Sequence, residues 1–222
     1  LGIDIGGTAV KMGIMNESLD IICRSETLLD RESGEHVMET VFGAVDEILS
    51  ETSLEVGSLA GIGVSAAGCV DKDTGAIAKN GGNVPGWAHT EVSRLLRERY
   101  GIPVTLVNDG NAVALAERDK GAAGGSDNVL CIVVGTGIGG GIISGGEILE
   151  GNHGFAGEIG HFPTHVGGQS ADDGGRGIYF ENNASAAALI REAVKVNSEW
   201  DSGRKLFKVA ATGNEAALGL ID

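Results

Sequence analysis

The chain has 222 residues, of which 38 are glycine and only three are proline, and its formal net charge is −15 at pH 7. This length can form one large domain or two small ones with a proper core, and glycine without periodicity excludes collagen and low-complexity disorder. The acidic excess argues against a nucleic-acid partner, because surfaces that bind a phosphate backbone concentrate Lys and Arg. A nucleoside triphosphate stays compatible with it, since Mg²⁺ and backbone N–H groups can supply positive potential locally.

Strands and helices alternate through the first half of the chain. Hydrophobic patterns predict strands at 1–5, 9–15, 21–29, 61–65 and 104–107, and helices at 36–50, 90–100 and 111–122. The helix at 36–50 carries one apolar stripe, which is typical of a helix that faces a core and has no chemistry of its own. The strand at 104–107 delivers Asn108 and Asp109 at its carboxyl end.

The second half begins after a glycine-rich stretch at 121–127, which is the best candidate for a boundary or hinge. A strand is predicted at 129–134, a hairpin at 141–151, a loop at 167–177, and helices at 181–198 and from 203 onward. We therefore expect an α/β protein with an N-terminal lobe (1–122), a C-terminal lobe (123–222) and a ligand cleft between them. The sequence opens inside a strand and ends inside a helix, so we expect further residues on both sides.

The three cysteines, Cys23, Cys69 and Cys131, are widely separated and form no CxxC pair. We expect three buried free thiols, which fits a reducing cytoplasm. No apolar run reaches roughly eighteen residues, and no basic region precedes an apolar stretch at the amino terminus. The sequence thus predicts neither a membrane span nor a signal peptide.

Two glycine turns follow apolar strands, Asp4-Ile5-Gly6-Gly7-Thr8 and Gly135-Thr136-Gly137-Ile138-Gly139-Gly140-Gly141. Each combines glycines that allow close approach, peptide N–H donors and a threonine hydroxyl, which suits a phosphate. Neither has the Lys of a P-loop. Asp4 at the end of its strand could order waters on Mg²⁺. The alternative for the first turn is a plain hairpin tip in which glycine supplies positive φ.

The second turn also satisfies the GxGxxG spacing of a dinucleotide site. In that fold the turn must open a helix whose amino terminus faces the pyrophosphate, and residues 141–146 are a poor helix. The spacing alone is a weak signal, so a dinucleotide fold is the less favoured reading.

Two further pairs of polar residues are candidates for chemistry. Asn108 and Asp109 are either caps of the next helix or the pair a kinase needs, with the carboxylate accepting a hydroxyl proton that the amide orients. Glu158 and His161 lie among glycines that disfavour a long helix. A metal site of these two with His153 matches no familiar spacing, and binding of a polyol is favoured.

Taken together, six ordered motifs resemble the ROK family of sugar kinases and related repressors, within the actin-like (ribonuclease H-like) ATPase superfamily. The motifs lie at residues 4–8, 61–71, 83–87, 107–112, 135–141 and 156–161. The resemblance covers nearly the whole chain. It implies a two-lobed actin-like fold and ATP-dependent transfer of phosphate to a hexose hydroxyl, with Mg²⁺, in a cytoplasmic protein. Relatives often pair, which is compatible with a homodimer.

The resemblance also implies roles for individual residues. Asp109 matches the general base that takes the proton from the hexose hydroxyl. The positions that match sugar ligands are Asn83, Asn108, Glu158, His161 and, displaced by one inserted residue, Glu181. The positions that match the phosphate-binding turns are Gly6, Gly7, Thr8, Gly135, Thr136 and Gly137. Glucose and N-acetylmannosamine, phosphorylated on the 6-hydroxyl, are the leading substrates.

One departure from the family pattern concerns zinc. Relatives often carry three cysteines after the Glu-x-x-His motif, and those positions fall here on Ala171, Asp173 and Ile178. Only His161 remains as a good ligand, so zinc is not expected. A sugar-sensing transcriptional regulator, whose DNA-binding segment would precede Leu1, is the alternative function. Retention of Asp109 and of both glycine turns favours catalysis.

Overall fold

The computed structural model describes residues 1–30, 32–79, 85–164 and 179–221. Its first half is built on a five-stranded sheet of order β3-β2-β1-β4-β7, in which β1 pairs antiparallel with β2 and parallel with β4. The strands are β1 (Gly2–Ile5), β2 (Ala9–Met15), β3 (Ile21–Leu28), β4 (Ile62–Ala66) and β7 (Val104–Asn108). Each predicted strand of this half is confirmed to within a residue or two.

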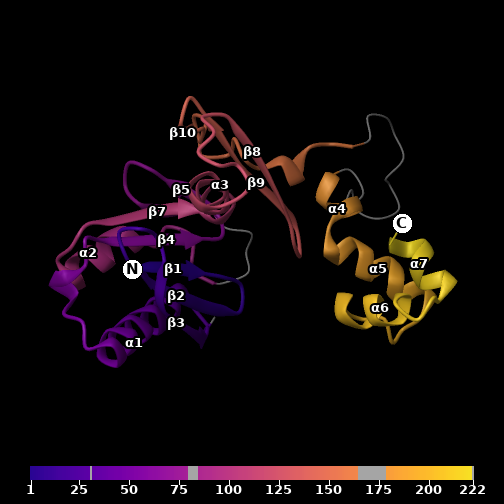
Figure 1. Ribbon diagram of the computed structural model, residues 1–222, viewed down its shortest axis with the longest axis horizontal. Helices are drawn as coiled ribbons and strands as arrows, with labels where there is room; N and C mark the ends of the chain where they lie inside the picture. Colours follow the sequence, from indigo (N-terminus) through magenta and orange to yellow (C-terminus); the bar gives the residue numbers. More distant parts are fainter. Residues whose placement is uncertain (31, 80–84, 165–178, 222) are drawn as a thin grey trace.

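Two helices cover one face of this sheet, α1 (Gly34–Thr52) and α2 (Val92–Tyr100) (Figure 1). The predicted stripe of α1 is buried against the strands and includes Val37, Val41 and Val45. Burial of this kind contributes roughly 1.5–3 kcal/mol for each large apolar side chain. The main core of the protein therefore lies between the sheet and α1 with α2.

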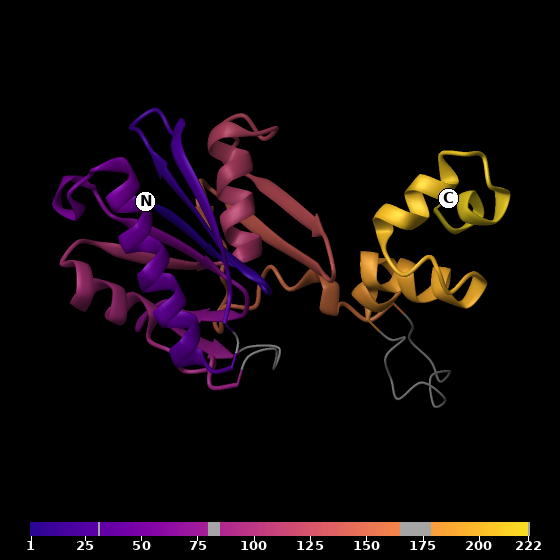
Figure 2. The same cartoon turned by 90° about the horizontal axis from the view of Figure 1, so that it is seen from below.

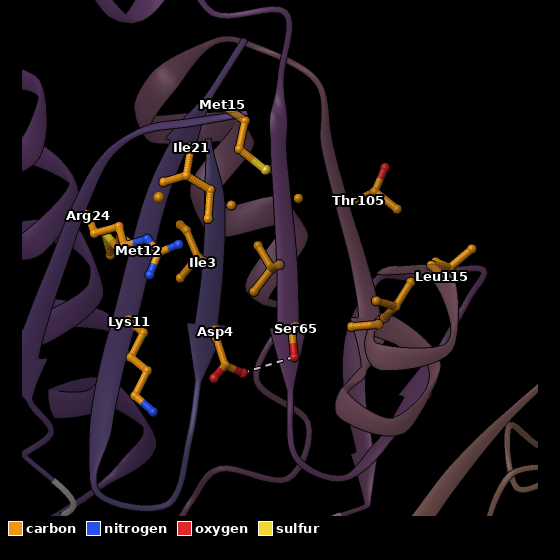
Figure 3. Close-up of a pocket in the computed structure, with 16 residues that line it drawn as sticks. Ile3, Asp4, Lys11, Met12, Met15, Ile21, Arg24, Ser65, Thr105 and Leu115 are labelled. Atoms are coloured by element: carbon orange, nitrogen blue, oxygen red, sulfur yellow. Dashed lines mark hydrogen bonds between the residues drawn. The ribbon is translucent and has the colours of Figure 1, made fainter. Parts of the chain in front are cut away.

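The opposite face of the sheet carries an apolar groove of about 580 Å³ (Figure 3). The groove is lined by glycines of three neighbouring strands, Gly2, Gly13 and Gly63. It is also lined by Leu115, which belongs to the helix α3 (Asp109–Lys120) that follows β7. Asp4 lines the same groove and is among its few charged residues.

A second sheet of order β10-β9-β8 is antiparallel throughout and comprises β8 (Val129–Val134), β9 (Ile138–Ser144) and β10 (Glu147–Ile148). Helix α3 (Asp109–Lys120) leaves the first sheet at the end of β7 and packs on β8 and β9 (Figure 2). A short hairpin, β5 (Cys69–Asp71) with β6 (Ala76–Lys79), extends from the end of β4. The turn η1 (Val56–Ser58) follows α1.

The chain ends in a group of short helices that Figure 1 shows well separated from the first sheet. They are α4 (Phe180–Ala184), α5 (Ala186–Val196), α6 (Gly203–Ala210) and α7 (Glu215–Ile221). Their small core is built around Trp200 and Leu206. The predicted helix 181–198 is interrupted at Ser185, which ends α4 and caps α5 through its side chain.

Three expectations require correction. Only Cys69 is buried, whereas Cys23 and Cys131 are half-buried, although all three thiols are free. Gly6 and Gly7 have no positive φ, so left-handed backbone does not explain them. Residues 139–141, read as part of the second turn, belong to strand β9. Because a strand follows the turn where a dinucleotide-binding fold needs a helix, the dinucleotide interpretation is wrong.

Among the described helices, none combines the length and hydropathy needed to cross a bilayer.

Candidate active site

The amino terminus of α3 carries Asp109 and is fixed by its neighbour Asn108. The Asn108 side-chain oxygen accepts hydrogen bonds from the N–H groups of Gly110 at 2.8 Å and Asn111 at 3.3 Å. Its amide nitrogen donates to the Gly68 carbonyl at 3.1 Å, which ties the helix start to the end of β4. Asn108 is thus the N-cap of α3, which was one of the two roles considered for it. A side-chain cap of this kind contributes about 1 kcal/mol to the free energy of unfolding.

The carboxylate of Asp109 remains accessible to solvent, and its Oδ1 accepts a hydrogen bond from the Gly110 N–H at 2.9 Å. Partial desolvation raises the pKa of Asp109 above its ordinary value, and the negative charge of Asp4 acts in the same direction. The hydrogen bond from Gly110 opposes this shift. A reachable carboxylate with a raised pKa has the properties of a general base.

A seam of glycines lets α3 approach strand β9 closely. A Cβ on Gly110 would collide with the carbonyl oxygen of Gly140, and a Cβ on Gly141 would lie 2.6 Å from the carbonyl oxygen of Gly110. From another segment, Gly157 and Gly160 make equally close approaches to the backbone of β9, at Gly140 and Ile138. Strand β9 is therefore the common support of the segments that carry Asp109 and Glu158.

Glu158 and His161 lie together at the short helix η2 (Ile159–His161). The Glu158 carboxylate is 3.6 Å from Nε2 of His161, whose ring makes an edge contact with Tyr179 at 5.6 Å between centroids. Desolvation raises the pKa of Glu158; His161 lowers it, and the charges of Asp109 and Glu181 raise it. Glu158 therefore lies close enough to Asp109 and to Glu181 for their charges to act on it.

The first glycine turn joins β1 to β2. Asp4 accepts a hydrogen bond from the hydroxyl of Ser65 at 3.0 Å, because the two residues are paired across the parallel strands β1 and β4 (Figure 3). The Gly6 N–H donates to the Ala9 carbonyl at 3.0 Å within the turn. Gly7 and Thr8 are exposed, so the outer part of this turn can be approached by a ligand.

The second glycine turn, between β8 and β9, is closed by a hydrogen bond from Gly135 N–H to the Gly137 carbonyl at 2.9 Å. The Glu181 carboxylate accepts a hydrogen bond from Ile138 N–H at 3.4 Å, and a Cβ on Gly137 would lie 2.7 Å from it. Thr136 at the tip is exposed. Glu181 thus links the second turn to Glu158.

Four carboxylates therefore form a series from one turn to the other, in the order Asp4, Asp109, Glu158, Glu181. Successive members influence one another electrostatically. A divalent cation near Asp4 would relieve the repulsion between Asp4 and Asp109. Asp4 suits Mg²⁺ in its donor chemistry, being an exposed carboxylate that leaves room for metal-bound water.

Asn83 and the positions of the missing zinc cysteines, Ala171, Asp173 and Ile178, fall outside the described residues. His153 is not grouped with Glu158 and His161 as a metal site. Within the described ranges, the group of potential metal ligands whose atoms lie within 4.8 Å of one another comprises Asp30, Glu32 and His36, near the start of α1.

Sequence reasoning missed two groups that position the site. Ser65 holds Asp4, and the Gly68 carbonyl holds Asn108. Both belong to the motif at 61–71, from which the sequence predicts no role for these two groups. The signal for Ser65 was its place in a strand that runs parallel to β1, but the sequence does not give the register of that pair.

The order of strands and helices, with three antiparallel strands followed by parallel strands after helices, defines an α/β protein of the actin-like ATPase superfamily. The model of the ROK family matches residues 1–222, and the chain belongs to this family. This confirms the family and the fold expected from the six motifs.

Individual relatives are consistent with membership of the ROK family. A glucokinase of Halalkalibacterium halodurans is 36% identical over 196 residues, which are 88% of this chain and 59% of that protein. A ROK hexokinase structure from Thermus thermophilus superposes with a TM-score of 0.78 at 34% identity, covering 99% of this chain and 71% of the other. A ROK glucokinase from Streptomyces griseus, in complex with glucose and AMPPNP, gives 0.78 at 27% identity, covering 99% and 73%. The chain thus spans somewhat under two thirds of the length of the first of these relatives.

Proposed function

We propose that this protein is an ATP-dependent kinase that phosphorylates a hexose hydroxyl, with Asp109 as the general base. The observation that carries the proposal is the accessible Asp109 carboxylate, fixed at the start of α3, whose pKa is raised by desolvation and by Asp4. The glucokinase and hexokinase relatives support the reaction class. The 6-hydroxyl of glucose or N-acetylmannosamine is the acceptor that we favour.

In this proposal each group acts on the sugar or on the phosphates. Asp109 accepts the hydroxyl proton as the oxygen attacks the γ-phosphate, while Glu158, His161, Asn83 and Glu181 bind other hydroxyls. The amide of Asn108 carries a second N–H beyond the one given to Gly68, and we assign it to the sugar.

The outer residues of both turns would contact the phosphates through backbone and hydroxyl. They are Gly6, Gly7, Thr8, Gly135, Thr136 and Gly137. Bound Mg²⁺ would neutralise phosphate charge, and Asp4 would hold it through water. We place the division between the lobes at 122/123 and the protein in the cytoplasm, where it acts as a monomer or homodimer.

The regulator alternative is less favoured. Sensing a sugar requires neither a base of raised pKa nor two turns that suit phosphate, and this chain has both features. The acidic charge of −15 also gives this segment no electrostatic reason to bind DNA.

The decisive test is Asp109→Asn in a coupled ADP-release assay across a small panel of hexoses. We expect kcat to fall by about 10² to 10⁴, the range that a positioned base contributes. Sugar binding, measured by calorimetry, should change little, because the amide keeps the shape of the carboxylate and one oxygen that can accept a hydrogen bond from the sugar hydroxyl. Unchanged turnover in the variant would end the assignment.

A further inference from the structure

The chain segments on either side of residues 165–178, which lie outside the described residues, are joined to each other at their ends. Pro163 and Tyr179 form an isolated antiparallel bridge. Beside it, the Phe180 N–H donates a hydrogen bond to the Phe162 carbonyl at 2.9 Å. The residues that follow η2 and the residues that begin α4 are therefore held together by contacts within the protein.

This junction lies in the part of the chain where relatives often carry three cysteines. The matching positions are Ala171, Asp173 and Ile178, which leaves His161 as the good zinc ligand. Structural zinc needs a tetrahedral set of ligands that are mostly Cys and His. The donor set of this chain does not fit zinc, so the position of the His161 ring has to be set by other contacts.

The ring of Tyr179 supplies such a contact to His161. The two ring centroids are 5.6 Å apart and the planes lie at 81°, an edge-to-face arrangement that aromatic pairs prefer. The His161 side chain is 56% exposed, and its contacts with described residues include the Glu158 carboxylate at 3.6 Å and the Tyr179 ring. An exposed side chain with few contacts can occupy several rotamers, so loss of the Tyr179 ring would release the imidazole.

Tyr179 also lies close in sequence to a second candidate sugar ligand. Glu181 follows it by two residues, and the Glu181 carboxylate accepts a hydrogen bond from the Ile138 N–H at 3.4 Å. The charge of Glu181 raises the pKa of Glu158. Tyr179 thus lies between the two segments that carry the candidate sugar ligands of this half of the chain.

We propose that Tyr179 is a positioning residue for sugar binding, whose ring holds the His161 imidazole in the orientation that binds a hexose hydroxyl. In this chain the aromatic contact takes the place of a metal ion at His161. The inference rests on the proposed function, because it takes His161 as a ligand of the sugar. Tyr179 acts through His161 and needs no contact of its own with the sugar.

The test compares Tyr179→Leu, which removes the ring and keeps an apolar side chain, with Tyr179→Phe, which keeps the ring. Calorimetry with glucose and N-acetylmannosamine should show a Kd for the better sugar that rises about fivefold in Tyr179→Leu, a size that an aromatic pair can supply. Tyr179→Phe should stay within about twofold of wild type. In the ADP-release assay KM for the sugar should rise in Tyr179→Leu, whereas KM for ATP should not.

A double-mutant cycle separates positioning from a general loss of structure. If Tyr179 acts through His161, adding Tyr179→Leu to His161→Ala should raise the sugar Kd by less than about twofold. Phe162→Leu is the matched control, because Phe162 is an exposed aromatic residue (60%) beside His161 and should leave the Kd unchanged. Urea unfolding checks that the variants fold, and Tyr179→Met replaces Tyr179→Leu if that variant does not.

An unchanged sugar Kd in Tyr179→Leu would overturn the positioning role, as would an equal rise in Phe162→Leu or a further full rise in the His161→Ala background. Elemental analysis of the wild-type protein tests the metal independently. After incubation with zinc and gel filtration, we expect well below about one zinc ion per chain. Stoichiometric zinc, whose removal by dipicolinate weakens sugar binding, would overturn the proposal.

Failure of the proposed kinase gives a different result. If no sugar is phosphorylated, the kinase assignment fails, and calorimetry alone decides the role of Tyr179. Sugar binding that weakens in Tyr179→Leu and not in Tyr179→Phe would support that role, and absence of sugar binding would overturn it.

Discussion

The glycines of this protein fall into two regions that differ in what surrounds them. In the seam between α3, β9 and η2, an added Cβ at Gly110, Gly140 or Gly160 would run into backbone atoms. In the turns, a Cβ at Gly7 or Gly135 would meet no described atom within 4 Å, and φ is not positive at either. The seam glycines are thus required by the fold. Gly7 and Gly135 have no such steric requirement, which supports close approach of a ligand to these two positions.

The largest effect is expected from Gly110→Ala, which tests whether the fold requires the seam glycines. Its Cβ would push against the Gly140 carbonyl, and overpacking of this kind costs about 1–3 kcal/mol of unfolding free energy. Because α3 must move to relieve the clash, we also expect kcat to fall through displacement of Asp109. Urea unfolding and the ADP-release assay measure the two effects. Gly43→Ala is the control, since Gly43 lies inside α1 with open space around it and should gain about 0.5–1 kcal/mol. Equal unfolding free energies for Gly110→Ala and the wild type would contradict the claim that the packing of α3 on β9 requires glycine at this position.

The converse change is made in the turns, with Gly135→Ala and Gly7→Ala. Stability should change by less than about 0.5 kcal/mol, the usual range for surface substitutions. KM for ATP should rise about tenfold, which corresponds to ~1.4 kcal/mol and to the loss of roughly one hydrogen bond. Gly57→Ala in η1 also has open space and should leave both quantities unchanged. A rise in KM for the sugar alone would show that the turns do not face the phosphates.

The pH dependence of the reaction tests the raised pKa of Asp109, the carboxylate on the helix that packs against the seam. The base must be ionised to accept a proton, so a raised pKa moves the acid limb of kcat/KM above the ordinary value of about 3.9. Asp4→Asn removes a negative charge that raises this pKa and should move the limb to lower pH. The readout is the midpoint of the pH profile, which is separate from any loss of rate. Asp119→Asn, at the far end of α3, should leave the midpoint in place.

The smallest expected effect is a gain in stability from Glu158→Gln. Desolvation raises the pKa of Glu158 in the folded protein, so between the ordinary and the raised pKa the folded state binds more protons than the unfolded state. Stability therefore falls as pH rises through this window, and the loss is complete at neutral pH. Gln carries no charge and should raise Tm at pH 7 by about 2 °C. Because the penalty is lost as the pH falls through this window, the gain should have disappeared below about pH 4. A gain that persists there would contradict the electrostatic cause.

Local sequence patterns were sufficient for most elements of the fold. The stripe of α1 and the five strands of the first sheet depend on hydrophobic period, which a chain carries locally. The position of Asn108 and Asp109 at the end of a strand was also readable, because a short apolar run ends there. The family motifs added the expected roles, and those roles remain predictions.

The limits of the pattern are visible at particular residues. Residues 139–141 look like part of a flexible turn, because glycine is typical of turns, yet they form the strand on which α3 packs. The interruption at Ser185 was also missed, since the residues on either side are good helix formers. In both places a neighbour distant in sequence or a single cap overrode local propensity.

The sequence by itself determined the class of protein, the two turns and the identity of the carboxylates, because these follow from residue types and short spacings. Only the tertiary structure decided that Asp109 and Glu158 share β9 as support, and that Ser65 holds Asp4. The contact between the Cys69 thiol and the carbonyl of His153, 84 residues further along the chain, was likewise decided by the tertiary structure. Such contacts, and the pKa values they set, depend on distances between segments that no local pattern records.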